Sequence, residues 1–194
     1  MTELAQIREI ETLCSRYGLR TFVETGCYKG DGIETAKRLG LRDIWSCDIG
    51  QTWVDQCRQR HEGAHIVHGL STEALPEMCQ GANGPTLFFL DAHLPEMYGT
   101  QGLSEDHKMP VVDELKLIRR HKKGYADDVI IVDDTRIIKS DDNPRWTPGE
   151  TICCEPIVGI SIMDVVGQLA DTHFSHHWLD NEGYIVFKPR LHAD

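Results

Sequence analysis

The segment from Thr21 to Gly32, TFVETGCYKGDG, decides the fold of this 194-residue chain. It opens on a β-branched and aromatic run that is typical of a buried strand. A glycine-rich turn follows, and a helix is expected to begin near Asp31 to Glu34. Glycines let backbone approach a ligand closely, and the first turn of a helix offers free N–H groups and the positive end of the helix dipole. The segment therefore predicts a ligand pocket between a strand and a helix.

Glu24, Gly26, Gly30 and Gly32 are the candidate ligand-binding residues of this segment. Their pattern, Glu-x-Gly-x-x-x-Gly-x-Gly, differs from the dinucleotide fingerprint Gly-x-Gly-x-x-Gly. A carboxylate at the end of a strand repels phosphate and favours a cationic, amino-acid-like ligand. The alternative is a tight strand-to-helix turn in which Glu24 is solvated.

Size and composition indicate one globular domain over residues 1–194. Hydrophobic residues make up 40% and charged residues 26%, and no apolar run approaches the length that a bilayer requires. The N-terminal segment lacks the apolar core of a signal peptide, so we expect a cytoplasmic protein that does not engage a membrane. The net charge of -11 repels nucleic acid. We expect a small-molecule substrate as partner, and association into a homo-oligomer stays open.

Alternating apolar strands and amphipathic helices predict an α/β fold with a doubly wound, mostly parallel sheet and helices on both faces. Apolar residues recur every three or four positions over residues 1–18, which predicts an N-terminal helix ended by Gly18. Residues 157–169 are a further expected helix. After the first strand, the expected strands cover 43–49, 64–68, 87–90, 129–132, 174–178 and 183–188, the last two as an antiparallel pair.

Two polar segments are predicted as loops at the edge of the pocket. Residues 94–109 contain glycines and acids without an apolar period. Loops of this length in compact domains are usually functional, so we expect a substrate lid. Residues 141–155 are predicted as a second pocket-edge loop, with Trp146 as an apolar anchor.

Asp48 is a further candidate for the ligand pocket, at the end of the second expected strand. It follows Glu24 by 24 positions, about where doubly wound folds place the acid that binds ribose hydroxyls. Ordinary solvation of a strand end is the alternative for this carboxylate.

Candidate chemical groups follow the two central strands. Asp91 and His93 emerge at the carboxyl end of the first, where open parallel sheets bind ligands. Asp133 and Asp134 emerge at the same end of the second. Three carboxylates repel one another unless a cation lies between them, and oxygen ligands in that number suit Mg²⁺ or a similar divalent cation. The alternatives are an Asp91 that caps its loop beside an exposed His93, an Asp133 that caps its loop, and an ion pair of Asp134 with Arg136.

Taken together, the stretches VETGCYKGDG, SCDIG, FFLDAH and IIVDDTR resemble the class I S-adenosylmethionine-dependent methyltransferase superfamily over nearly the whole chain. The resemblance implies a Rossmann-like sheet that ends in a reversed strand. It also implies that Glu24 and the glycines surround the methionine part of the cofactor. Members often carry an acid near the adenine after the third strand. Here the chain has Ser71, which offers a neutral contact or, like Thr72, caps the next helix.

Within the superfamily, the three strand-end carboxylates are similar to those of the metal-dependent sugar O-methyltransferases of the macrocin type and their cephalosporin-hydroxylase-like relatives. The resemblance implies methyl transfer to a small hydroxylated substrate, such as a sugar or a natural product. A divalent ion at Asp91, Asp133 and Asp134 would lower the pKa of a bound hydroxyl, and His93 would take its proton. Two alternatives stay open: a metal-dependent hydrolase that uses the same carboxylates, and a non-catalytic binding domain on the same fold.

Overall fold

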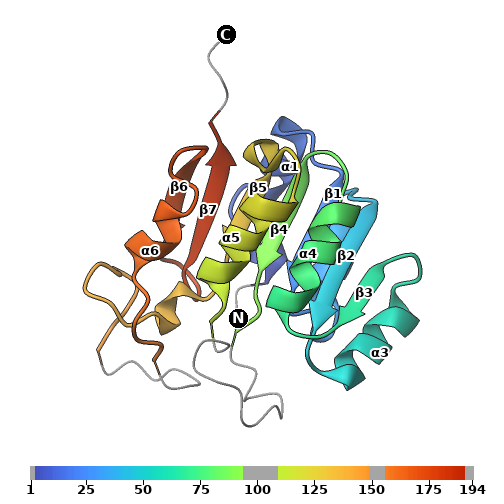
Figure 1. Ribbon diagram of the computed structural model, residues 1–194, viewed down its shortest axis with the longest axis horizontal. Coiled ribbons are helices and arrows are strands. Elements are labelled where there is room, and N and C mark those ends of the chain that lie inside the picture. Colours follow the sequence, from blue (N-terminus) through green and yellow to red (C-terminus); the bar gives the residue numbers. More distant parts are fainter. Residues whose placement is uncertain (1–2, 94–108, 149–155, 191–194) are drawn as a thin grey trace.

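The computed structural model describes residues 3–93, 109–148 and 156–190, which form a seven-stranded sheet (Figure 1). The strands are β1 Thr21–Thr25, β2 Asp43–Asp48, β3 His65–His68, β4 Thr86–Leu90, β5 Val129–Val132, β6 His173–Trp178 and β7 Tyr184–Pro189. Their spatial order is β3-β2-β1-β4-β5-β7-β6. Strands β1 to β5 are parallel, and β7 is antiparallel to both of its neighbours. The predicted doubly wound sheet with a C-terminal antiparallel pair is confirmed.

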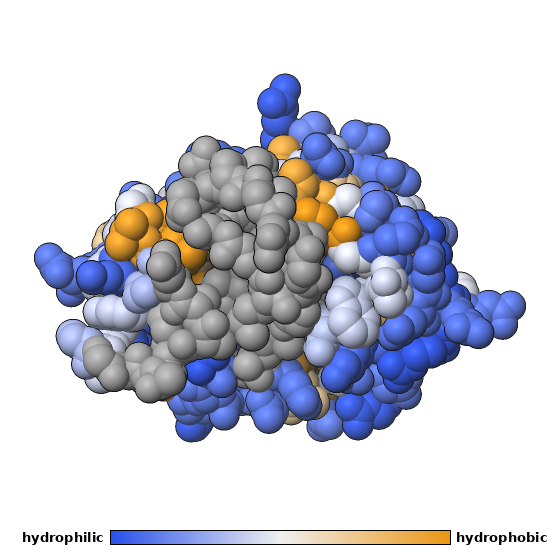
Figure 2. Space-filling model, turned by 90° about the horizontal axis from the view of Figure 1, so that it is seen from below, coloured by the Kyte–Doolittle hydropathy of each residue, from blue (hydrophilic) through white to orange (hydrophobic). Residues whose placement is uncertain are grey.

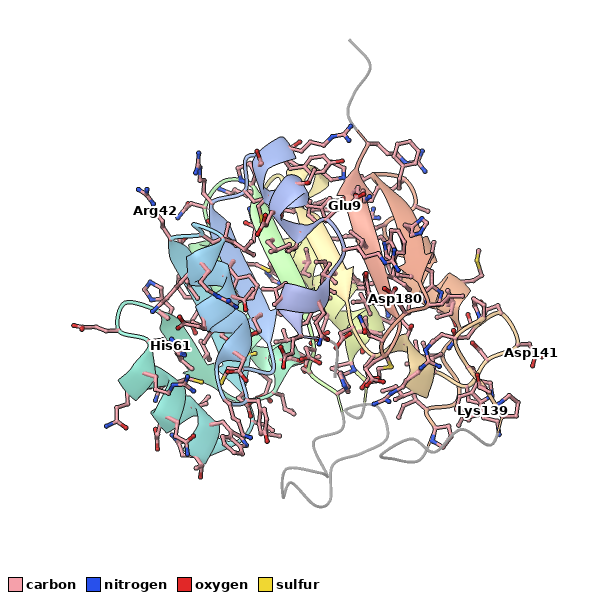
Figure 3. All side chains as sticks on the ribbon, turned by 180° about the vertical axis from the view of Figure 1, so that it is seen from behind. Glu9, Arg42, His61, Lys139, Asp141 and Asp180 are labelled. Atoms are coloured by element: carbon pink, nitrogen blue, oxygen red, sulfur yellow. The ribbon has the colours of Figure 1, made fainter. Side chains whose placement is uncertain are left out.

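Helices cover both faces of the sheet. Those with α-helical geometry are α1 Ile10–Arg16, α2 Asp31–Arg38, α3 Gln51–Arg60, α4 Ser71–Gly81, α5 Val111–His121 and α6 Ile162–Gly167, and the short 3₁₀ turns are η1 Leu4–Gln6, η4 Tyr125–Asp127 and η5 Thr135–Ile137. Helices α4, α5 and α6 share one core with the sheet, while η1, α1, α2 and α3 share the other (Figures 1 and 3). Within the described part of the chain, no helix has the length and apolar character needed to cross a membrane.

The continuous apolar runs of β4 and β5 follow from these two cores. Side chains of a strand alternate between the faces of its sheet, so Phe88 and Ile130 pack under α4 and α5. Leu87 and Ile131 point to the opposite core. Because both faces are buried, neither strand has room for the polar residues that alternate in a half-exposed sheet.

The topology brings the candidate functional residues to one end of the molecule. The chain turns outward in opposite directions from β1 and β4, and such a switch point leaves a crevice at the carboxyl ends of the two strands. In Figure 1 the parallel strands β1 to β5 end at the lower edge. Figure 2 views that end and shows hydrophobic patches within a mostly hydrophilic surface.

The prediction of one N-terminal helix over residues 1–18 is wrong. The described part contains the turn η1 and the helix α1, separated at Glu9, whose φ of 60° is left-handed. The N–H of Arg8 donates to the hydroxyl of Tyr184 in β7 at 3.1 Å, so it is not available to the hydrogen-bond ladder of a continuous helix. A tertiary contact therefore accompanies a break in the helix, although the amphipathic pattern of the sequence continues through it.

The predicted helix over residues 157–169 is shorter than expected. Helix α6 begins after Ser161, whose side chain accepts the N–H of Asp164 in a capping box. Ile157 instead forms an isolated parallel bridge with Ile138. The capping box marks the start of the helix, which the spacing of the apolar residues alone does not identify.

The first predicted pocket-edge loop falls almost wholly outside the described residues, and so does the last part of the second. Residues 94–108 of the first and 149–155 of the second are not described. The lid expected over 94–109 therefore stays a prediction.

Replacing Phe88 by alanine should destabilise the protein by about 3–5 kcal/mol, because it opens a cavity in a fully buried strand. Phe174 is a matched control of the same residue type, since it is 59% exposed and its ring lies 4.2 Å from the Arg190 guanidinium. Its replacement should cost less than about 1 kcal/mol. Urea unfolding measures both, and equal losses in the two variants would contradict the assignment of Phe88 to the core.

Candidate functional site

The glycine loop after β1 is bent tightly between two neighbouring strands. The N–H groups of Gly26 and Cys27 both donate to the carbonyl of Cys47 at 2.9 Å. Gly26 has a φ of +88°, and a Cβ atom there would lie 2.8 Å from the carbonyl oxygen of Asp91. Only glycine suits this combination of left-handed backbone and close approach.

Glu24 is buried beneath the first turn of α2. Its side chain accepts a hydrogen bond of 2.8 Å from the Ser46 hydroxyl, and a Cβ at Gly32 would lie only 1.8 Å from its other oxygen. Burial raises the pKa of Glu24 to about 8, against the opposing effect of the Ser46 hydrogen bond. A carboxyl in this state gains most from a ligand that brings a positive charge.

Asp48 holds the glycine loop and also faces a cavity. One carboxylate oxygen accepts the N–H of Tyr28 at 2.9 Å, and the other accepts the N–H of Gly50 at 2.7 Å. Each oxygen keeps a further lone pair for a ligand. The carboxylate is therefore fixed in place before any ligand arrives.

Two adjoining cavities lie at the carboxyl ends of the strands. The first is lined by Asp48, Ser71 and His93 among others. The second includes Glu24 and Gly32 in its lining. Both are bounded by Gly26, Tyr28 and Asp91. The two cavities are therefore neighbours that share one wall.

Most of the candidate residues predicted from the sequence line one or both of these cavities, but three of them line neither. Gly30 is not among the described residues that line either cavity, and a Cβ there would lie 2.5 Å from Nε2 of His61. It lets the end of α3 pack against α2 (Figure 3). Asp133 and Asp134 are 1% exposed and likewise absent from both linings.

His93 lies between two carboxylates. Its Nε2 is 2.7 Å from Asp134, and its Nδ1 is 3.3 Å from Asp91. Burial alone would lower the pKa of His93, but the hydrogen bond to Asp134 and the charge of Asp91 raise it to about 9. Burial raises the pKa of Asp91 well above its usual value, with partial compensation by His93. With this pKa the imidazole is protonated at neutral pH.

The described residues do not fit the predicted metal site. One oxygen of Asp134 faces His93, and the other accepts a hydrogen bond of 2.9 Å from Nε of Arg136. Two cationic donors thus occupy the positions that a metal ion would take. Across residues 3–93, 109–148 and 156–190, no group of three His, Cys, Asp or Glu side chains is arranged to hold one. The alternative in which Asp134 pairs with Arg136 agrees with the geometry.

Sequence reasoning missed two residues of this region. Tyr28 borders both cavities, and its ring packs edge-on against Trp53 with 4.5 Å between centroids. Glu114 is a buried carboxyl in α5. It occupies the same face as Val111, Leu115 and Ile118, and a glutamate within an apolar stripe was the available signal.

The stability of the protein should depend on the proton of Glu24. An unfolded glutamate loses its proton near pH 4.5, whereas the folded one keeps it to about pH 8. Between these values deprotonation favours the unfolded state, so the contribution of Glu24 to stability falls as pH rises, by at most about 1.4 kcal/mol per pH unit. Glu24→Gln should remove that part of the slope in urea unfolding between pH 5 and 8. The control Glu77→Gln, at an exposed glutamate of α4, should not, and equal slopes in wild type and Glu24→Gln would refute the prediction.

Comparison with known proteins places the fold among methyltransferases. No family model and no curated protein matches the chain. Among solved structures, the sugar N-methyltransferase KedS8 from a Streptoalloteichus species has a TM-score of 0.60 and 10% identity, over 98% of this chain and 87% of its own. The S-adenosylhomocysteine-bound methyltransferase PaMTH1 of Podospora anserina has a TM-score of 0.58 and 13% identity, over 93% and 76%. An O-methyltransferase of Bacillus cereus with S-adenosylhomocysteine has 0.53 and 15%, over 93% and 78%. At these identities the likeness shows a Rossmann-like methyltransferase fold.

Proposed function

We propose that this protein transfers a methyl group from S-adenosylmethionine to an oxygen atom of a small hydroxylated acceptor of the sugar or natural-product type. The observation that carries the proposal is the pair of adjoining cavities with an acid in each, Glu24 in one and Asp48 in the other. A ligand with a cationic amino-acid end and a nucleoside end matches both. The methyltransferase fold and the O- and N-methyltransferases among its structural neighbours support the same reaction class.

The residues divide the cofactor between the two cavities. Glu24 and the backbone around Gly32 would hold the amino-acid end, where a positive charge favours the ionised form of the buried carboxyl. Asp48 would accept hydrogen bonds from the ribose hydroxyls, and Ser71 would contact the base. When bound, S-adenosylmethionine supplies a methyl group activated by its sulfonium charge. Gly26 lies on the border of both cavities, and because it has no side chain its backbone would be able to approach the ligand closely.

Asp91 and His93 are the groups placed to act on the acceptor. Both line the first cavity, and Asp91 also borders the second. Asp134 holds the imidazole by Nε2, which leaves Nδ1 directed toward Asp91. We assign this pair to orienting the acceptor hydroxyl and taking its proton as the oxygen attacks the methyl group. The described residues offer no metal site for this step, and none is part of the proposal.

Calorimetric titration with S-adenosylmethionine and S-adenosylhomocysteine tests the cofactor assignment. We expect saturable binding of both, with equal affinity in Mg²⁺ and in chelator. Asp48→Ala should weaken binding by about tenfold or more, because two hydrogen bonds to ribose are lost. Asp134→Asn, a change outside both cavities, should leave affinity within about twofold. Equal affinities in wild type and Asp48→Ala would sink the ribose assignment, and no binding at all would favour the hydrolase or the non-catalytic domain.

Turnover should depend on the neutral form of His93. Because the pKa of its imidazole is raised to about 9, the neutral fraction increases as pH rises toward that value, and the rate should rise with it. His93→Gln should lower turnover by about a hundredfold, abolish this pH dependence and leave cofactor affinity nearly unchanged. Formation of S-adenosylhomocysteine with a panel of sugars and phenols measures the rate. An unchanged rate on an accepted substrate would remove His93 from the chemistry.

A further inference from the structure

We propose that two copies of this chain pair through strand β6, with the two strands antiparallel about a twofold axis at His176. The pairing surface is the edge of the sheet, and none of the described residues that line the two cavities belongs to β6. The proposal goes beyond the proposed function and does not depend on it.

The two edge strands of the sheet, β3 and β6, differ in how their edges are protected. Strand β3 is four residues long, and the carbonyl of its Ile66 accepts two hydrogen bonds from the Arg58 guanidinium, at 2.8 and 3.2 Å. Strand β6 is six residues long and contains neither lysine nor proline. Figure 1 shows it as the outermost strand on the left. Edge strands without such protection readily pair with a further strand, so β6 is the edge at which one can be added.

The pairing with β7 determines which backbone groups of β6 face outward. The N–H of Arg190 donates to the carbonyl of Thr172 at 2.9 Å, and bonds of this kind recur at every second residue of an antiparallel ladder. Even-numbered residues of β6 therefore bond to β7, and odd-numbered residues direct their N–H and C=O groups outward. His173 agrees with this pattern, because its N–H donates to the carbonyl of Leu169 at 2.8 Å and its C=O accepts Nε of Arg190 at 3.1 Å.

The outward groups of Ser175 and His177 receive no hydrogen bond from another described residue. These two residues lie symmetrically about His176. A twofold axis at His176 places Ser175 opposite His177 of the partner subunit, and each such pair exchanges two hydrogen bonds. This register uses every open backbone group of both strands. A second copy of the chain is therefore the occupant that matches the edge.

The side chains on one face of β6 fit the same register. Phe174, His176 and Trp178 share this face. The Arg190 guanidinium lies 4.2 Å from the ring of Phe174, and the rings of His176 and Trp178 are 4.2 Å apart. Phe174 is 59% exposed, and the twofold axis would place it opposite Trp178 of the partner subunit. Such an aromatic cross-strand pair would add burial of apolar surface to the backbone hydrogen bonds.

Charge also favours a second copy at this edge, although the chain has a net charge of -11. Strand β6 has no acidic side chain. The nearest acids in sequence are paired within the chain, Asp171 with Arg119 at 2.7 Å and Asp180 with Arg8 at 2.8 Å. In the proposed register Asp180 lies on the same face as Arg190 of the partner subunit and close to it. Opposite charges would therefore meet at both ends of the paired strands.

Sedimentation velocity over a concentration series tests the pairing. We expect a monomer–dimer equilibrium between about 1 µM and 1 mM, because small interfaces associate weakly. His176→Lys places two ammonium groups opposite each other at the axis, so it should raise the dissociation constant by about tenfold or more. His65→Lys is the matched control, since it makes the same change in β3 at the other edge. It should leave the dissociation constant within about twofold.

An engineered disulfide tests the register. Residues at the axis form a non-hydrogen-bonded pair with Cα atoms about 4.5 Å apart, which is within the range of a disulfide. His176→Cys should therefore give a covalent dimer under mild oxidation, detected on a non-reducing gel. Phe174→Cys is the control, because its two thiols would lie about 13 Å apart along the strands. Wild type, whose described cysteines are buried, should stay uncrosslinked under the same treatment.

Three results would overturn the proposal, and none of them bears on cofactor binding. The first is a wild type that stays monomeric up to about 1 mM. The second is a dimer that His176→Lys does not weaken, and the third is crosslinking of Phe174→Cys as strong as that of His176→Cys. Should His176→Lys not fold, Ser175→Pro takes its place, because it removes an outward N–H and no bond to β7. An unchanged dimer in that variant would contradict the pairing.

Discussion

The close approach of the Gly26 backbone to Asp91 is the constraint on which the site depends. It occurs where β1 and β4 lie side by side and the chain leaves them in opposite directions. A side chain at residue 26 would push the two strand ends apart, and the border shared by the two cavities would move with them. Asp48 then fixes the loop from the side of β2 through the N–H of Tyr28. The position of every proposed ligand contact follows from this junction.

This end of the molecule also contains several buried carboxyl groups. Glu24, Asp91 and Glu114 all have pKa values raised chiefly by burial. His93 and Arg136 lie at the same end of the sheet, and both are engaged with Asp134. Such a site gains from any cation that enters it. The sequence-based hypothesis filled that need with a metal ion, whereas the proposed function fills it with a sulfonium and an ammonium carried on one ligand.

The sequence predicted well those features that depend on local pattern. The apolar runs of β4 and β5 and the acids that follow them identified the central strands and the functional end of the sheet, because a parallel strand buried on both faces has a distinctive composition. The break at Glu9 could not be predicted, since it depends on a hydrogen bond from Arg8 to the distant Tyr184. The ion pair of Asp134 with Arg136 was among the alternatives, but the contact of Asp134 with His93 was missed for a similar reason. A count of carboxylates does not reveal that a histidine from another segment already lies against one of them.

The position of β7 has a consequence for how the molecule is made. It is the last of the described strands in sequence, yet it lies inside the sheet, between β5 and β6. Strand β6 therefore has no partner until β7 has been synthesised, and β5 keeps an open edge until then. The turn before β7 also binds the segment after Asp134, through the N–H groups of Thr135 and Arg136. During translation, a ribosome-bound chain that already carries all of the glycine loop would still lack the contacts that hold Thr135 and Arg136, the two residues that follow the carboxylate partner of His93.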